Sequence, residues 1–328
     1  MTGLASPLSL GRFTMRNRII MPPMANNLAE EDGTASARLV EHYRVRAAGG
    51  PGMIIVEHSY VTRDGRVDPH QLGISADAHV AGLAPIAAAI HEGGALAVIQ
   101  ITHGGSRCPS SATGRQPAGP SNIRVPGDPE DPRPLTIEEI HSLPALFAAA
   151  ARRAMEAGFE GVEVHGAHGY LLNEFASPYT NRRTDEYGGL LPNRLRAAGE
   201  VLTTVRDALG DSLLLYRFGV DDGPVEGVTP TMAAEMAPTL AGWGVDLLDC
   251  SGGLCGSRPV DRTGQGFFVP AAAIVRAASP VPVSAVGGIT EPRYADDILR
   301  RGLVDAVCVG RAQLKDPEWA AKALAQVG

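Results

Sequence analysis

The sequence predicts a (β/α)8 TIM barrel of the α/β class, because strand-like runs alternate with helix-like segments and each kind occurs eight times. Most of the strand-like runs are continuously apolar, which is typical of parallel strands buried on both faces. The 328 residues are enough for such a barrel with insertions. We therefore expect one domain that spans residues 1–328.

Each predicted strand ends at polar residues or glycines, where the chain would leave the barrel wall. The strands cover residues 18–22, 53–57, 96–101, 161–165, 213–218, 245–250, 281–286 and 305–309. A segment rich in Gly, Pro and Ser, residues 104–134, follows the third strand. We expect this segment to form a capping loop over the barrel mouth, with no further strand or helix in it.

The predicted helices occupy residues 35–48, 78–92, 136–157, 192–209, 229–243, 270–277, 291–301 and 317–325. Two of them have recognisable starts. Thr136 and Glu139 fit a capping box, in which each side chain accepts a hydrogen bond from the other residue's amide. Thr290 is predicted to cap the helix at 291–301, with Pro292 at a position that needs no amide donor.

The composition is that of a folded protein without a nucleic-acid or membrane partner. Apolar residues make up 44% and charged residues 20%, and the net charge is −7. No apolar stretch approaches the ~18 residues of a membrane helix, and residues 1–13 lack a signal-peptide pattern, so a cytoplasmic location is expected. The four scattered cysteines, including Cys250 and Cys255, predict neither a disulfide framework nor a metal site.

The fourth predicted strand ends at His165, with His168 and Tyr170 just after it, and barrel enzymes bind their ligands at the carboxyl ends of the strands. Two imidazoles can bind a developing oxyanion and a phenol can donate a proton. The three residues are therefore candidate catalytic residues. A His-x-x-His pair can also bind a metal or lie on the surface, but a metal site here lacks an evident third ligand.

The last two strand ends carry candidate phosphate-binding residues. Gly287 and Gly288 follow the seventh strand, and Gly310 and Arg311 follow the eighth. Bare backbone amides and a guanidinium bind phosphate oxygens well, although glycines there could also serve only as tight turns.

Gln100 and Arg217 would face the barrel centre from the third and fifth strands. A carboxamide can pair with the edge of a uracil-like ring, and a guanidinium can stabilise the charge that appears when such a ring is reduced. Together with the phosphate corner these residues suggest FMN. Arg217 could equally be a core arginine paired with an acid.

Residues 164–189, VHGAHGYLLNEFASPYTNRRTDEYGG, resemble the signature of the Old Yellow Enzyme family of flavin-dependent ene-reductases. Residues 17–24, 100–105 and 132–136 are also similar to motifs of that family. The resemblance implies that the isoalloxazine is held by Pro23, Met24, Ala25, Gln100 and Arg217, and the FMN phosphate by Gly287, Gly288, Gly310 and Arg311.

The same resemblance implies a two-stage reaction. NADPH or NADH would reduce the flavin and leave, and an α,β-unsaturated carbonyl compound would then occupy the same face. His165 and His168 would bind its activating oxygen, flavin N5 would deliver hydride to the β-carbon, and Tyr170 would protonate the α-carbon.

Two positions depart from the family pattern. Ala25 stands where Thr or Cys is frequent, so a side-chain hydrogen bond to the flavin O4 edge would be absent. His58 stands where a small residue is common, and it could add a polar contact near the flavin or point elsewhere. The run at residues 181–189 is expected to be structural.

The expected function is that of a single-barrel FMN-dependent ene-reductase that acts on a small enone and forms a homo-oligomer. One alternative is an amine dehydrogenase or dienoyl reductase with a separate electron partner, although the cysteine-rich cluster site and dinucleotide domain of such relatives are not expected here. Another is a flavin-free aldolase or isomerase that binds a sugar phosphate. Three arginines of the capping loop favour an anionic substrate or a pyridine-nucleotide phosphate: Arg107, Arg115 and Arg124.

Overall fold

Eight parallel strands form a closed barrel, as the sequence predicts. The computed structural model describes residues 2–125, 127–128, 130–223 and 225–327. In barrel order the strands are β3 (Ile19–Met21), β4 (Met53–Tyr60), β5 (Leu96–Thr102), β8 (Gly161–Gly166), β9 (Leu213–Gly219), β10 (Leu247–Ser251), β11 (Val283–Ala285) and β12 (Ala306–Cys308). Their ends differ from the predicted ends by no more than three residues.

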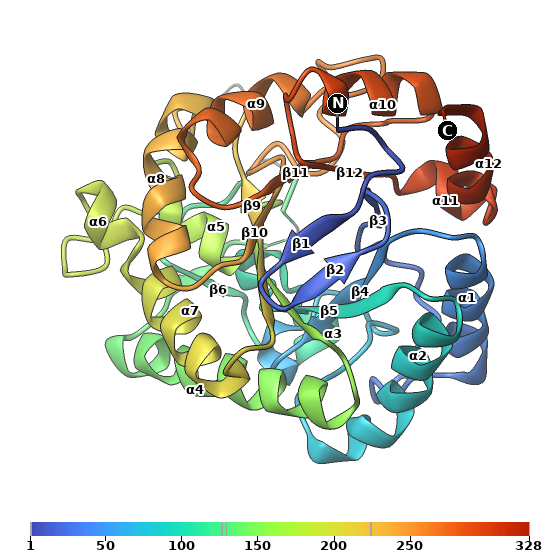
Figure 1. Cartoon of the computed structure of the whole chain (residues 1–328). Coiled ribbons are helices and arrows are strands. Elements are labelled where there is room, and N and C mark those ends of the chain that lie inside the picture. The colour runs from blue at the N-terminus through green and yellow to red at the C-terminus, as the bar shows by residue number, and fades with distance from the viewer. Residues whose placement is uncertain (1, 126, 129, 224, 328) are drawn as a thin grey trace.

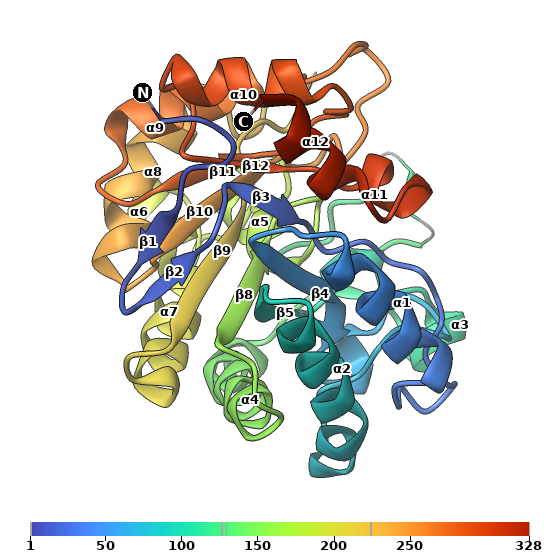
Figure 2. The ribbon, with the colours of Figure 1, turned by 45° about the vertical axis from the view of Figure 1, so that its right-hand side comes forward.

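An outer ring of helices surrounds the barrel (Figures 1 and 2). The ring consists of α1 (Ala37–Ala48), α2 (Val80–Glu92), α4 (Ile137–Glu156), α7 (Arg196–Leu209), α8 (Pro230–Gly242), α9 (Val269–Ala278), α10 (Pro292–Arg300) and α12 (Trp319–Val327). The stretch predicted at 192–209 is divided into α6 (Leu191–Arg194) and α7. Arg194 donates to the carbonyls of Ala176 and Gly189, which holds α6 against the preceding loop.

Several short elements were not predicted. Two 3-10 turns, η1 (Arg63–Gly65) and η2 (Asp77–His79), lie between β4 and α2. The α5 helix (Leu171–Ala176) begins directly after Tyr170, and α11 (Arg311–Lys315) begins at Arg311.

The capping segment has more regular structure than expected. It contains η3 (Gly105–Arg107), α3 (Ser110–Thr113) and the two-residue strands β6 (Ala118–Gly119) and β7 (Arg133–Pro134). The expectation that residues 104–134 lack strands and helices is therefore wrong. The reason is that β6 and β7 pair with each other in parallel and close the base of the loop, a contact that local sequence does not reveal.

An N-terminal hairpin closes the amino end of the barrel, and the sequence analysis missed it. Strands β1 (Leu8–Leu10) and β2 (Phe13–Met15) pair in antiparallel fashion. Figure 1 shows the hairpin lying across one end of the barrel. Leu10 and Met15 are fully buried in a cluster with barrel residues from the starts of the strands, such as Met53 and Leu213. The functional cavity must therefore lie at the opposite end.

The two predicted helix caps have different outcomes. The capping box is confirmed: the Glu139 amide donates to Thr136 Oγ1 at 3.2 Å, and the Thr136 amide donates to Glu139 Oε2 at 2.8 Å. The Thr290 cap is wrong, because α10 has Glu291 at its N-cap and no side-chain cap. The amides of Thr290 and Glu291 donate instead to Gln265 Oε1, at 3.2 and 3.1 Å. A distant side chain thus replaces the local hydroxyl.

Replacement of Thr136 by alanine should lower the free energy of unfolding by about 0.5–2 kcal/mol, because α4 loses the acceptor for an otherwise unpaired amide. Thr136→Ser keeps the hydroxyl and should recover most of the loss. Urea unfolding midpoints of the three proteins provide the measurement. Equal midpoints for Thr136→Ala and the unaltered protein would contradict a stabilising cap.

Membrane-spanning helices, disulfide bonds and metal-binding clusters are all absent from the described residues. No helix in the described ranges is both long and apolar enough to cross a membrane. The four cysteines are free thiols, and Cys108, Cys250 and Cys308 are buried. No cluster of three or more His, Cys, Asp or Glu side chains is placed to hold a metal in the described part of the chain.

Candidate active site

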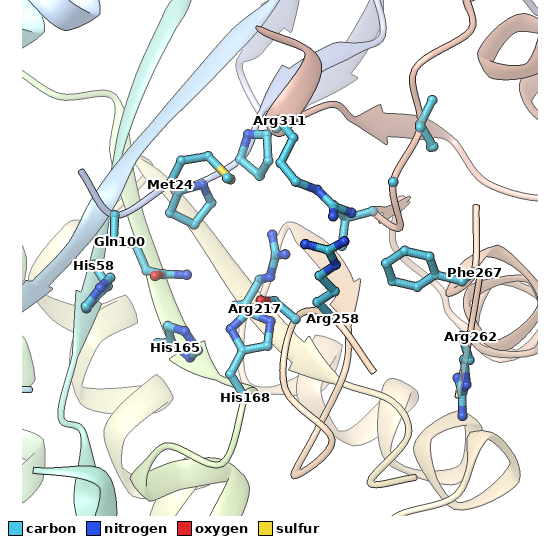
Figure 3. Close-up of a pocket in the computed structure, with 18 of the residues that line it drawn as sticks. Met24, His58, Gln100, His165, His168, Arg217, Arg258, Arg262, Phe267 and Arg311 are labelled. Atoms are coloured by element: carbon cyan, nitrogen blue, oxygen red, sulfur yellow. The ribbon is translucent and has the colours of Figure 1, made fainter. Parts of the chain in front are cut away.

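A cavity of about 730 Å³ lies at the carboxyl ends of the barrel strands (Figure 3). Its lining includes every predicted site residue except Gly287: Pro23, Met24, Ala25, Gln100, His165, His168, Tyr170, Arg217, Gly288, Gly310 and Arg311. Gly287 itself does not line the cavity, but its carbonyl accepts hydrogen bonds from the amides of Gly266 and Phe267, and Phe267 is a lining residue. The fold therefore brings together residues that the sequence predicts at six different strand ends.

The loop between β10 and α9 forms a wall of the cavity that the sequence analysis did not predict. Its lining residues are Ser257, Arg258, Arg262, Thr263, Gly264 and Phe267. Arg262 forms an ion pair with Asp221 at 2.6 Å, which ties this loop to the loop after β9. The available signal was the presence of two arginines, Arg258 and Arg262, within a Gly-rich segment after the sixth strand.

The side chains of His165, His168 and Tyr170 are in mutual contact. The His165 ring centroid lies 5.1 Å from that of His168 and 4.6 Å from that of Tyr170. The Ala167 amide donates to His165 Nδ1 at 3.2 Å, so Nε2 carries the proton of the neutral ring. His168 Nε2 lies 2.7 Å from Ser251 Oγ at the end of β10, which fixes the second ring.

Burial sets the protonation states of this cluster. It lowers the pKa of His165 and of His168 well below the usual value, and the Arg217 and Arg107 charges lower both further. Burial raises the pKa of Tyr170 to about 12, although the charge of Arg107 opposes the change. At neutral pH the cluster therefore consists of two neutral imidazoles and a protonated phenol. Such groups can hydrogen-bond a substrate oxygen and supply a proton.

The barrel centre beneath the cavity holds a buried polar cluster. Gln100 Nε2 donates to Glu163 Oε1 at 2.7 Å, and Arg217 Nη1 forms an ion pair with Asp249. Arg217 thus has both properties that the sequence left open, since it lines the cavity and is also paired with an acid. Asp249 accepts a further hydrogen bond from Ser284 Oγ at 2.8 Å.

The phosphate corner has little room for side chains beyond those present. A Cβ atom at Gly310 would lie 2.6 Å from Met24 Sδ, and one at Gly288, where φ is +70°, would lie 3.2 Å from Arg311 Nη2. In the described part of the chain Arg311 forms no ion pair, and its side chain reaches the cavity (Figure 3). Open backbone beside an available guanidinium suits a phosphate group.

The whole cavity fits FMN by the chemistry of its lining. The phosphate corner offers Arg311, and the barrel centre offers the Gln100 amide and the Arg217 guanidinium to a polar ring edge. The lining also includes apolar residues such as Met24 and Ile289, against which a flat ring can pack. These residues could hold FMN, and no observation at the site conflicts with it.

The two departures from the family pattern both lie at the cavity. Ala25 and His58 also line a second hollow of about 380 Å³ beside Tyr170, together with Arg107 of the capping segment. Gln71 Nε2 lies 2.7 Å from His58 Nδ1, and burial lowers the pKa of His58 to about 4. His58 therefore belongs to the wall as a neutral ring rather than pointing elsewhere.

The run at residues 181–189 anchors the capping segment. Arg183 is paired with Asp185 at 2.6 Å and donates to the carbonyls of Pro120 and Leu135, which flank the segment's base. Asn181 donates to the carbonyls of Phe175 and Tyr187. These contacts agree with the structural role expected from the sequence.

Acidic neighbours partly compensate the three arginines of the capping loop. The pairs are Arg107 with Asp128 at 3.3 Å, Arg115 with Asp64 at 2.9 Å and Arg124 with Asp131 at 3.6 Å. Only Arg107 lies at the second hollow. The case for an anionic substrate therefore rests on Arg107 alone among the three.

Comparison with known proteins places this geometry in a family context. The profile of the NADH:flavin oxidoreductase / NADH oxidase family matches residues 3–327. The chain is 40% identical over 321 residues to an NADH oxidase of Thermoanaerobacter brockii, covering 96% of this chain but only 49% of that protein. It is 38% identical over 328 residues to an NADPH dehydrogenase of Geobacillus sp. (strain WCH70), covering 100% of this chain and 95% of that protein.

A solved structure supports the same relationship. The structure of an old yellow enzyme homologue from Zymomonas mobilis superimposes with a TM-score of 0.88 at 30% sequence identity. The match covers 99% of this chain and 93% of that one.

Proposed function

Because this chain belongs to the NADH:flavin oxidoreductase / NADH oxidase family, we propose that it is an FMN-dependent ene-reductase that uses NAD(P)H to reduce activated C=C bonds. The observation that carries the proposal is the neutral His165–His168 pair beside the protonated Tyr170, in one cavity with Arg311. A flavin-free aldolase or isomerase is excluded by the family. The substrate class is an α,β-unsaturated carbonyl compound.

The proposed cofactor contacts follow the two ends of the cavity. Pro23, Met24, Ala25, Gln100 and Arg217 hold the ring, and Gly287, Gly288, Gly310 and Arg311 hold the phosphate. When bound, FMN supplies the hydride acceptor and donor that no side chain can provide. The guanidinium of Arg217 would stabilise negative charge at the ring edge that it contacts.

The proposed roles of the cluster follow from its protonation states. His165 offers its Nε2–H to the substrate oxygen, because Nδ1 already accepts from the Ala167 amide. His168 is held by Ser251 and assists at the same oxygen. Tyr170 keeps its proton at neutral pH and gives it to the α-carbon. Because reductant and enone share one cavity, they bind in turn, and ping-pong kinetics follow.

We propose that residues 1–328 act as one FMN-binding barrel domain, located in the cytoplasm and assembled as a homo-oligomer. The decisive experiment is anaerobic reduction of the purified yellow protein by NADH and by NADPH, followed by reoxidation with a panel of enones. Reoxidation by enones without any added electron carrier supports the ene-reductase. Reoxidation only through an added electron carrier would instead favour an amine dehydrogenase or dienoyl reductase with a separate electron partner.

Introduction of a hydrogen-bond donor, a hydroxyl or a thiol, at Ala25 should raise the two-electron potential of bound FMN by about 20–65 mV. The side chain of residue 25 lines the cavity, and a hydrogen bond worth ~1–3 kcal/mol more to the reduced ring corresponds to that shift. Ala25→Thr and Ala25→Cys test this by redox titration, with Ala25→Val as the control of similar shape without a hydroxyl. Equal potentials for Thr and Val at this position would show that residue 25 does not reach the ring.

A further inference from the structure

Glu163 is a buried acid of the barrel centre that has no role in the proposed reaction. It lies on β8 next to Gln100 of β5 in the strand register, and its exposed fraction is 0%. Its Oε1 accepts a hydrogen bond from Gln100 Nε2 at 2.7 Å. Its Oε2 is buried and has no hydrogen-bond donor among the described residues. A buried carboxylate oxygen without a donor is costly, so this atom needs an explanation.

The surrounding charges are already balanced without Glu163. Asp249 is 0% exposed and Arg217 is 3% exposed, and the two form an ion pair. An ionised Glu163 would therefore add an uncompensated negative charge at a fully buried side chain. Burial, and next the nearby Asp249 charge, raise the pKa of Glu163 well above its ordinary value. A protonated Glu163 removes the excess charge and turns Oε2 into a donor for Asp249.

We propose that Glu163 is a positioning residue that, as a neutral carboxylic acid, holds the Gln100 amide with its carbonyl oxygen free toward the cavity. One of the two N–H groups of the amide donates to Glu163 Oε1, which fixes the orientation of the amide and leaves its oxygen and its second N–H available to a ligand. An acceptor at this place is suited to the single ring N–H of the FMN uracil-like edge. This inference rests on the proposed function for the identity of the ligand, but the protonation of Glu163 does not.

A glutamine at position 163 reproduces the proposed state atom for atom. Its Oε1 can accept from Gln100, and its amide nitrogen can donate to Asp249, while the side chain carries no charge. Glu163→Ala keeps neither contact. The pair of variants therefore separates the loss of charge from the loss of positioning, and the volume-conserving E163Q guards against a folding defect in Glu163→Ala.

The first measurement is infrared difference spectroscopy of the purified protein at neutral pH, with E163Q subtracted from the unaltered chain. We expect the difference to contain the carbonyl band of a protonated carboxyl group, shifted in D2O. Bands of an ionised carboxylate in its place would overturn the proposal. This measurement does not need bound FMN, so it remains decisive even when the proposed function fails.

The second measurement is FMN affinity. E163Q should bind FMN within about threefold of the unaltered protein, and its potential should stay within about 15 mV, the equivalent of a threefold change. Glu163→Ala and Gln100→Ala should each weaken FMN binding by roughly 5–20 fold. The double variant should bind FMN as well as the single variant that has the lower affinity. Asp296→Asn, at a buried carboxyl on α10 outside the cavity lining, is the control.

Two outcomes of the affinity measurement would contradict the positioning role. One is an E163Q protein as weak as Glu163→Ala, which would mean that the charge itself matters. The other is full additivity of Glu163→Ala and Gln100→Ala, which would mean that the two side chains act independently. An unaltered protein that binds no FMN would refute the proposed function, and the infrared result would then stand alone.

Discussion

Tyr170→Phe should slow the reoxidation of reduced enzyme by an enone by about 100–10,000 fold, the range for a positioned general acid, and leave reduction by NAD(P)H nearly unchanged. The phenol donates only in the second half-reaction, so the effect should be confined to it. In the described part of the chain the Tyr170 hydroxyl makes no hydrogen bond to protein, and phenylalanine retains the ring contacts with His165 and His58. The variant should therefore fold normally.

Rapid-mixing measurements of each half-reaction decide this prediction. Tyr179→Phe is a matched control, because Tyr179 does not line the cavity. Equal slowing of both half-reactions would mean that the phenol shapes the cavity rather than acting as an acid. An unchanged rate of reoxidation would mean that solvent, and not Tyr170, supplies the proton to the α-carbon.

Arg311→Ala should weaken FMN binding by roughly 10–150 fold, since a charge-assisted hydrogen bond contributes ~1.5–3 kcal/mol. Riboflavin, which lacks the phosphate, should bind Arg311→Ala and the unaltered protein equally well. The FMN affinity of Arg311→Lys should fall between those of Arg311→Ala and the unaltered protein, because an ammonium keeps the charge but not the planar pair of donors.

The control for this prediction is Arg301→Ala, at a residue that is 61% exposed and paired with Asp297 on α10. Fluorescence titration of the apoprotein with both flavins gives the dissociation constants. An equal loss of FMN and riboflavin affinity would mean that Arg311 contacts the ring or stabilises the fold, and that it does not bind the phosphate.

The barrel and most of the site could be predicted because both depend on local patterns. A parallel strand that is buried on both faces appears in the sequence as a continuous apolar run. The polar residues at the carboxyl end of that run lie at the end of the barrel where ligands bind. His165 and Arg217 lie in the last three residues of β8 and β9, and Arg311 follows β12. Their convergence in one cavity follows from barrel closure, which the count of eight runs implied.

The remaining features depend on contacts between distant segments. The three-residue strands of the hairpin are too short for a periodic pattern, and only burial against the barrel stabilises them. The local sequence predicts a cap at Thr290, but it does not reveal that Gln265, 25 residues away, accepts the hydrogen bond from the Thr290 amide. Arg262 and its loop are placed by the pair with Asp221, 41 residues distant, which no local rule predicts.

The backbone at His168 restricts which residues evolution can place there. Its φ of +59° lies in the left-handed region, where β-branched and bulky side chains are strained and where His, Asn and Asp are enriched. The position must also present a hydrogen-bonding group next to Ser251. Asparagine satisfies both demands without charge, whereas aspartate would add a buried anion and glycine would leave no side chain. Histidine and asparagine are thus the two residues that best meet both demands at this position.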